Sequence, residues 1–271
     1  NAVYFSNTRG ATTVVAAEPE YRELSRNDLP EGIYASAAPL DGCIYIRTTA
    51  ALYCITDLGA VRPEPPSSPA TEPLAVTAAQ TSPGAVDLSQ GWWAQFRGPY
   101  ATGVTTQKPV EPGWDVPGGK GLLWKAPIPL PGRSSPVVWD DAIFLTGADE
   151  KTREVYCFDA ASGALRWRQP VTGEKGGGAP EVSADTGYAA STPVTDGQRV
   201  YAIFATGDVG CFDMDGQSIW SKSLGVPDNT YGHATSLLAH KGMLLVQFDQ
   251  ESEEAPRSKL LAFDAATGRT A

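Results

Sequence analysis

Calcium binding is the first chemistry to consider, because two aspartates flank a methionine in the run Asp-Met-Asp-Gly at residues 213–216. This run resembles the middle of an EF-hand loop, in which alternating residues supply oxygen ligands to Ca²⁺. The full pattern would need an oxygen ligand at Cys211 and a glutamate at Lys222. Both positions fail, so we interpret the run as a tight turn between two strands.

The other reactive residue types do not fall at catalytic spacings. His233 and His240 are the only histidines, and their spacing matches no common zinc motif. The glycine-rich run at 118–121 lacks the Ser or Thr that follows the lysine of a phosphate-binding loop. No G-x-S-x-G nucleophile elbow is present either. From these patterns we predict no catalytic, cofactor-binding or metal-binding residue.

Composition narrows the classes of partner. The net charge is −10 over 271 residues, and no cluster of Lys or Arg stands out, which argues against nucleic acid as a partner. No run of about 18 apolar residues occurs, so we expect no membrane-spanning helix. The hydrophobic content of 42% is ample for a buried core.

The residues are organised as a repeat. An apolar strand, an Asp-containing turn and a Trp occur together at 155–167 and again at 209–220, and a third copy begins at 260–271. A second unit precedes the first and consists of two short strands joined by a tight turn such as Asp41-Gly42, which is typical of a β-hairpin. Its copies lie at 36–48, 134–147, 191–204 and 235–248.

A repeat of about fifty residues made only of short strands predicts a β-propeller. Helical signals are weak, because no window keeps a 3.6-residue apolar period with caps. We therefore expect an all-β fold whose blades are four-stranded antiparallel sheets. Trp124, Trp167 and Trp220 recur once per repeat and are predicted to pack between blades. In the turn, Asp159 is expected to accept backbone hydrogen bonds, while Gly163 supplies a positive φ.

Residues 58–90 interrupt the repeat with six prolines among Ala, Ser, Thr and Glu, which predicts an exposed linker. We expect residues 1–57 to be closing strands of a propeller, and 91–271 to be the opening three to four blades of another ring or of the same ring rearranged. At about fifty residues per blade, the chain holds too few complete blades to close a ring, so we expect the ring to be incomplete. The last copy of the turn stops one residue before its expected Trp, so we also expect the chain to be a fragment.

The turn resembles the repeat of the pyrroloquinoline-quinone-type (PQQ-like) β-propellers, in which Asp, two residues, Thr and Gly, and three residues precede a Trp. Asp159, Ser162, Gly163 and Trp167 match this pattern, with Ser in place of Thr. The W-x-x-F-R-G run at 93–98 and the S-S-P-V-V strand are also similar to propellers of the BamB-like type. The resemblance covers 91–271 well and 33–57 in part.

This resemblance implies one of two broad classes, a non-enzymatic scaffold or a quinoprotein dehydrogenase. The dehydrogenases hold the quinone and a calcium ion in the channel, beside a disulfide between adjacent cysteines. No two cysteines are adjacent in this sequence. Cys54, Cys157 and Cys211 instead recur at one strand position, where small apolar residues pack.

We therefore expect a non-catalytic scaffold that binds a protein or a small ligand at the propeller face or channel, without a cofactor. One alternative is a fragment of a quinoprotein dehydrogenase that uses PQQ and calcium. Another is an accessory propeller of a larger enzyme or sensor. Family analogy favours a periplasmic or extracellular location.

Two residues are candidates for ligand contact. Arg133, Ala190 and Ala234 precede the first strand of their repeats at equivalent places. In a propeller this strand is innermost, so these positions face the mouth of the channel. Arg133 and His233 could then meet a ligand or partner. The alternative is that they only close backbone turns.

Overall fold

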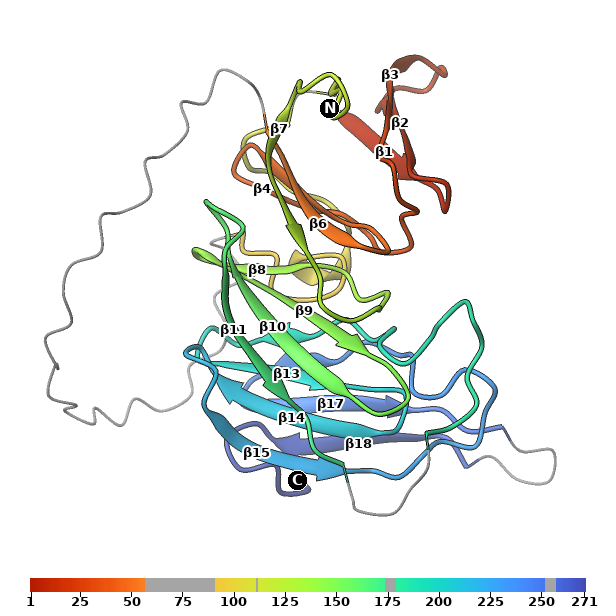
Figure 1. Cartoon of the computed structure of the whole chain (residues 1–271). Helices are drawn as coiled ribbons and strands as arrows, with labels where there is room; N and C mark the ends of the chain where they lie inside the picture. The colour runs from red at the N-terminus through yellow and green to blue at the C-terminus, as the bar shows by residue number, and fades with distance from the viewer. Residues whose placement is uncertain (57–90, 111, 174–178, 252–256) are drawn as a thin grey trace, which may run out of the picture.

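Five antiparallel β-sheets follow one another along the chain (Figure 1). The computed structural model describes residues 1–56, 91–110, 112–173, 179–251 and 257–271. Within these ranges the only helical element is the short 3-10 turn η2 (Pro99–Ala101). The predicted all-β architecture is confirmed.

Each sheet is an up-and-down series of neighbouring strands, and three of the five have four strands. The first sheet contains β1 (Ala2–Ser6), β2 (Ala11–Ala16) and β3 (Glu23–Asp28). The second contains β4 (Ala38–Leu40), β5 (Cys43–Arg47), β6 (Ala51–Thr56) and β7 (Leu122–Pro127). The third contains β8 (Val137–Trp139), β9 (Ala142–Ala148), β10 (Arg153–Asp159) and β11 (Leu165–Pro170). The fourth contains β12 (Val194–Thr195), β13 (Arg199–Ile203), β14 (Asp208–Asp213) and β15 (Ser218–Ser223). The fifth contains β16 (Leu238–His240), β17 (Met243–Phe248) and β18 (Lys259–Asp264).

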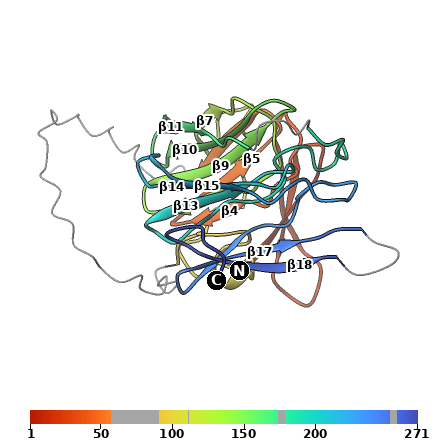
Figure 2. The same ribbon diagram turned by 90° about the horizontal axis from the view of Figure 1, so that it is seen from below.

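The sheets pack face to face as the blades of a propeller do. Four hydrophobic clusters fill the four spaces between consecutive sheets. The first strands β4, β8, β12 and β16 contact one another in succession and form the inner edge of the stack. No hydrophobic cluster of the described residues joins the first sheet to the fifth, so the ring is open, as predicted. Figure 2 looks along the stack, and there the two chain ends overlap although Figure 1 shows them far apart.

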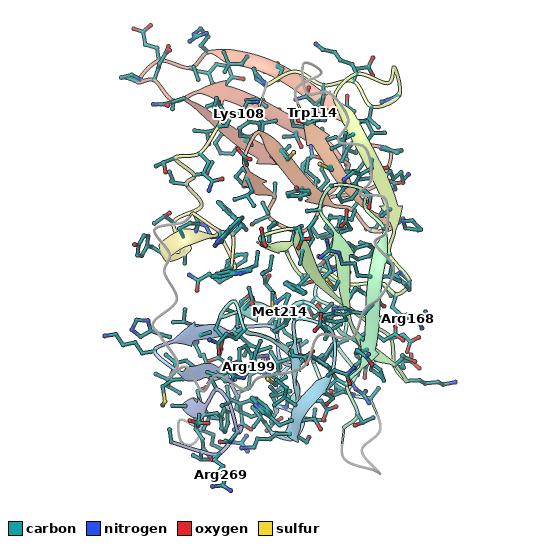
Figure 3. The ribbon with its side chains drawn as sticks, turned by 90° about the vertical axis from the view of Figure 1, so that its left-hand side faces the viewer. Lys108, Trp114, Arg168, Arg199, Met214 and Arg269 are labelled. Carbon is teal, nitrogen blue, oxygen red and sulfur yellow. The ribbon has the colours of Figure 1, made fainter. Side chains whose placement is uncertain are left out.

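A tryptophan on the outer strand of one sheet packs against the Asp turn of the next sheet. The indole nitrogen Nε1 of Trp124 donates to the carbonyl of Ala160 at 3.0 Å. Trp167 Nε1 donates to the Met214 carbonyl at 3.0 Å, and Figure 3 shows Met214 in the interior between sheets. Trp220 repeats the bond to Ala265 at 3.1 Å. The predicted position of these tryptophans between blades is confirmed.

The turn that receives each tryptophan is held by its aspartate. The Asp159 carboxylate accepts hydrogen bonds from the Ser162 amide at 2.8 Å and the Ser162 hydroxyl at 2.7 Å. Gly163 has a φ of 71°, and a Cβ added there would lie 2.5 Å from the Trp124 ring. The turn therefore needs glycine both for its backbone conformation and for the approach of the indole.

Strand β7 joins the two folded ranges that flank residues 58–90. It pairs with β6 in a register that sets Trp124 opposite Cys54. Residues 1–57 and 91–271 thus contribute to one sheet, and 58–90 belongs to the connection between two of its strands. Residues 58–90, which we predict to be a linker, lie outside the described residues. The predicted division of the chain into 1–57, 58–90 and 91–271 stays a prediction.

The W-x-x-F-R-G run does not start with a blade strand but lies along the inner edge of the stack. The Trp93 carbonyl accepts the Val138 amide of β8 at 2.9 Å, and the Ala94 carbonyl accepts the Thr195 amide of β12 at 3.0 Å. The Trp93 ring is buried in the cluster between the second and third sheets. This segment therefore ties the inner strands of the third and fourth sheets together.

We predict that Gly163→Ala lowers the free energy of unfolding by about 3 kcal/mol, because a left-handed backbone strain adds to a clash with the Trp124 ring. Gly225→Ala is the matched control, since Gly225 has a φ of 80° but an added Cβ would meet nothing within 4 Å. The control should cost about 1 kcal/mol, from backbone strain alone. Urea unfolding of both variants measures the difference, and equal losses would contradict the packing role of the tryptophan.

Candidate binding face

One end of the stack carries all the connections that lead from one sheet to the next. Because the strands alternate in direction, every connection from one sheet to the next emerges at the same end. The described parts of these connections are residues 29–37, 128–136, 171–173, 179–193 and 224–237. We call them the loop face. The opposite end carries the tight turns within the sheets and also the connection from β6 to β7, whose described residues are 91–110 and 112–121.

A ladder of hydroxyl groups links the sheets where the loop face meets the inner strands. The Ser135 hydroxyl accepts the backbone amide of Ser36 at 3.0 Å, and the Thr192 hydroxyl accepts the amide of Ser135 at 3.0 Å. The Ser236 hydroxyl accepts the amide of Thr192 at 3.2 Å. Each hydroxyl thus satisfies a backbone donor of the preceding sheet.

Sequence reasoning missed this ladder, although a signal for it exists. In the third and fourth sheets, the hydroxyl residue stands directly before a proline, as Ser135-Pro136 and Thr192-Pro193. A proline has no amide to donate, so the preceding residue carries the last backbone donor before the inner strand. The recurrence of a hydroxyl at that place predicts a shared structural partner.

Arg133 lies on the loop face and bridges two sheets. Its guanidinium lies over the Tyr34 ring at 3.5 Å from the ring centroid, and its Nη2 donates to the Ala184 carbonyl at 2.6 Å. Its backbone amide donates to the Ala189 carbonyl at 2.8 Å. Arg133 is therefore half-buried with a fixed side chain, and its backbone also closes a contact between loops.

His233 lies inside the fold rather than on the surface. Its side chain is 3% exposed, its Nδ1 is hydrogen bonded to the Ser191 hydroxyl at 3.2 Å, and its ring packs on Phe248. Its backbone amide donates to the Ala205 carbonyl at 3.0 Å. His233 shares none of these contacts with Arg133, so the structure does not bring the two sequence candidates together.

Burial determines the charge of His233. Removal from water is the largest effect and lowers the pKa of the imidazole from 6.5 to about 4. The ring is therefore neutral at pH 7, while its Nε2 is buried without a hydrogen-bond partner. A neutral, enclosed imidazole is suited to packing between the fourth and fifth sheets.

Arg47 is a second arginine of this region, and no sequence signal pointed to it. It ends the apolar strand β5, is 2% exposed, and donates from Nη1 to the Ser134 carbonyl at 3.2 Å and hydroxyl at 2.5 Å. Burial lowers the pKa of its guanidinium to about 9, and the charge of Arg133 acts in the same direction. Arg47 nevertheless stays charged at pH 7, and its Nε is buried without a partner.

The two arginines place two positive charges beside connections that also carry Glu31, Glu181 and Asp185. Among the described residues, no carboxylate forms an ion pair with Arg47 or Arg133. Other arginines do have such partners: Arg168, which extends from the outer strand β11 (Figure 3), pairs with Glu154 at 2.7 Å. The chemistry available at Arg133 is therefore recognition of negative charge and of aromatic surface.

The repeat geometry and the inner-edge segment agree with a known family. The family described as "Outer membrane protein assembly factor BamB" matches residues 114–271, more than half of the chain. The chain belongs to this family. The predicted PQQ-like, BamB-like repeat is thereby confirmed. A search among curated proteins found no significant sequence match.

Solved structures of this fold include both scaffolds and enzymes. BamB from Moraxella catarrhalis aligns with a TM-score of 0.59 and 13% identity, over 100% of this chain and 60% of that one. The quinohemoprotein alcohol dehydrogenase ADHIIG from Pseudomonas putida HK5 aligns with a TM-score of 0.52 and 11% identity, over 99% of this chain and 40% of that one. A europium-containing methanol dehydrogenase aligns with a TM-score of 0.50 and 10% identity, over 99% of this chain and 48% of that one. At these identities the likeness concerns the fold alone, and this chain spans less than two thirds of each structure.

We predict that Ser135→Ala destabilises the fold by about 1 kcal/mol, because the partly buried Ser36 amide loses its acceptor. Ser221→Ala, on the exposed part of β15, is the control and should change stability by less than about 0.5 kcal/mol. Amide hydrogen exchange gives a local readout: the Ser36 amide should exchange faster in Ser135→Ala, and the Ser135 amide in Thr192→Ala. Unchanged protection at both amides would refute the ladder.

The buried histidine predicts a loss of stability in mild acid. The unfolded imidazole takes up a proton near pH 6.5 and the folded one only near pH 4, so the unfolded state binds more protons between these values. Stability therefore falls as the pH drops from 6.5 to 4, by up to about 3 kcal/mol from this group.

Urea unfolding at pH 7 and pH 4.5 measures this pH dependence. His233→Gln should reduce the stability difference between the two pH values. His240→Gln replaces the other histidine, which is exposed on β16, and should keep the difference. A pH dependence that is the same in both variants would show that His233 is not its source.

Proposed function

We propose that this chain is a non-catalytic binding scaffold and that a protein partner docks on the loop face. The observation that carries the proposal is the stacked pair of Tyr34 and Arg133. Tyr34 is 44% exposed, although the arginine covers one face of its ring. Tyrosine and arginine are among the residues that contribute most to protein interfaces.

The pair is already held in one conformation before any partner arrives. Arg133 is fixed by the Ala184 carbonyl and by the Tyr34 ring, on loops that are themselves tied by the hydroxyl ladder. Side chains that are ordered in the free protein lose less entropy on binding. The loop face is therefore suited to recognise a partner through a small number of rigid contacts.

Charge supports the kind of partner. Arg133 and the nearby Arg47 carry positive charge on an otherwise acidic chain. Complementary charge favours specific partners and speeds association. We propose that the partner presents an acidic segment. The description of the family names an outer membrane protein assembly factor. We therefore propose that the partner is another protein of such an assembly machinery.

The hydrogen bond between Ser191 and His233 resembles the nucleophile–base pair of a hydrolase, but its surroundings favour a structural role. Both side chains are buried between sheets, with Ser191 at 1% exposure. The Ser191 hydroxyl also bonds to the His233 carbonyl at 3.3 Å. A nucleophile must reach its substrate, and this hydroxyl is enclosed by backbone.

A quinoprotein dehydrogenase is the second candidate, favoured by the likeness to the two dehydrogenase structures. Calcium in proteins takes six to eight oxygen ligands. Among the described residues, no three His, Cys, Asp or Glu side chains gather as a metal site. These residues do not fit the calcium-and-quinone group, so no catalytic step is derived through it. An accessory propeller of a larger enzyme or sensor stays a further prediction.

One structural finding bears on the membrane. No helix in the described part of the chain is long and apolar enough to cross a bilayer.

Site-specific photo-cross-linking tests the scaffold proposal. A photoreactive phenylalanine analogue at position 34 should give one dominant, saturable cross-link to an envelope protein of the source cell. Excess unlabelled wild-type chain should compete for the cross-link, and Arg133→Ala should compete poorly. The control places the analogue at Tyr100, which is 72% exposed on the segment that borders the tight turns.

Two results would overturn the proposal. The first is equal cross-linking from positions 34 and 100. The second is dye-linked alcohol oxidation by the chain with stoichiometric PQQ and Ca²⁺, which would favour the dehydrogenase instead.

A further inference from the structure

Two of the four cysteines lie next to each other across a pair of strands. In the register of β5 and β6, Cys43 is opposite Thr56 and Tyr45 is opposite Cys54. Residues two apart on a strand share one face of the sheet, so Cys43 and Cys54 are diagonal neighbours on the same face. Both belong to the packing between the second and third sheets, and both are free thiols.

Of the groups around Cys43, the Cys54 thiol has the largest effect on its protonation. The Cys54 thiol hydrogen bonds to Cys43, and this bond is the largest effect that lowers the pKa of Cys43. The neighbouring Thr56 and Tyr45 hydroxyls lower the pKa of Cys43 further, whereas burial and the charge of Asp41 raise it. Cys54 is fully buried and keeps its proton, so Cys43 is the first of the pair to become a thiolate.

The other two cysteines occupy the same strand position as Cys54 but have no second cysteine beside them. Cys157 and Cys211 are the counterparts of Cys54 in the third and fourth sheets. The residues that correspond to Cys43 there are Ala142 and Arg199. Burial is the largest effect on both thiols and raises the pKa of Cys157 to about 12 and that of Cys211 still further.

Exposure also distinguishes the members of the pair. Cys43 is partly exposed at the start of β5, beside the tight turn, whereas Cys54 has no exposed surface. A reagent from solution can thus reach Cys43, and Cys54 can be reached only through it. In thiol chemistry this is the arrangement of an attacking cysteine with a resolving cysteine behind it.

We propose that Cys43 and Cys54 are a redox-active pair, which a low-molecular-weight disulfide such as oxidised glutathione converts into a cross-strand disulfide. The Cys43 thiolate attacks one sulfur of the small disulfide, forms a mixed disulfide and releases one small thiolate. Cys54 then passes its proton to that thiolate and attacks the Cys43 sulfur, which expels the second small thiolate. Two protein thiols are oxidised, and one small disulfide is reduced to two thiol groups.

The disulfide would join β5 and β6, the two central strands of the second sheet. The bond would lie near the tight-turn end of these strands, and both cysteines pack against the third sheet. Its formation would therefore change the packing between the second and third sheets. This inference does not depend on the proposed function, because it concerns only the two thiols.

Thiol titration and mass spectrometry of the folded chain test the proposal. After the folded chain is incubated with oxidised glutathione and then unfolded in denaturant, the number of titratable thiols should fall from four to two. The intact mass should fall by two hydrogen atoms, and peptide mapping should link Cys43 to Cys54. Dithiothreitol should restore all the thiols.

Single variants separate the two roles. Cys54→Ser should stop at the mixed disulfide and retain one glutathione on Cys43, while Cys43→Ser should retain none. Cys157→Ser and Cys211→Ser are matched controls for the buried position and should still form the disulfide. If Cys54→Ser does not fold, Cys54→Ala and the peptide map of the wild-type chain carry the test.

Retention of all four free thiols by the folded chain would overturn the proposal. So would glutathione addition that does not differ between Cys43 and the two partnerless cysteines.

Discussion

The contact of an indole ring with a glycine in the next sheet is the interaction on which the rest of this fold depends. The outer strand of each four-stranded sheet carries a tryptophan, and the following Asp turn offers a carbonyl to its nitrogen and a glycine to its ring. Any side chain at that glycine would displace the indole. Repetition of one such contact fixes the spacing of the sheets, and thereby the positions of their inner strands.

A second set of contacts acts at the inner edge. The hydroxyl ladder from Ser36 to Ser236 satisfies backbone donors between sheets, and the Trp93 segment adds backbone bonds to β8 and β12. The tryptophans hold the outer part of each sheet and the hydroxyls hold the inner part. The connections on the loop face are then free to differ in length and sequence, which is how a repeated frame acquires a specific surface.

Local features of this molecule could be predicted from its sequence, and distant ones could not. The Asp159 turn and the position of Trp167 follow from short, recurring spacings, because their physics involves neighbouring residues. The bond between Arg47 and Ser134 joins residues far apart in the chain, and the pairing of β6 with β7 crosses the whole of 58–90. No spacing encodes such contacts. His233 was a reasonable candidate by its position, but only the packed structure shows that the ring is enclosed.

The unusual chemistry of the chain arises where one repeat departs from the others. Strand β5 corresponds to β9 and β13, yet it has cysteine where they have Ala142 and Arg199, and Arg47 where they have threonine and isoleucine. These two departures place a thiol beside Cys54 and a buried positive charge beneath the loop face. A residue that only builds the blade can be the same in every repeat. A polar or charged residue at a buried position needs hydrogen-bond partners that the other blades do not provide. Strand β5 carries two such residues, and it therefore departs from the repeat in its chemistry.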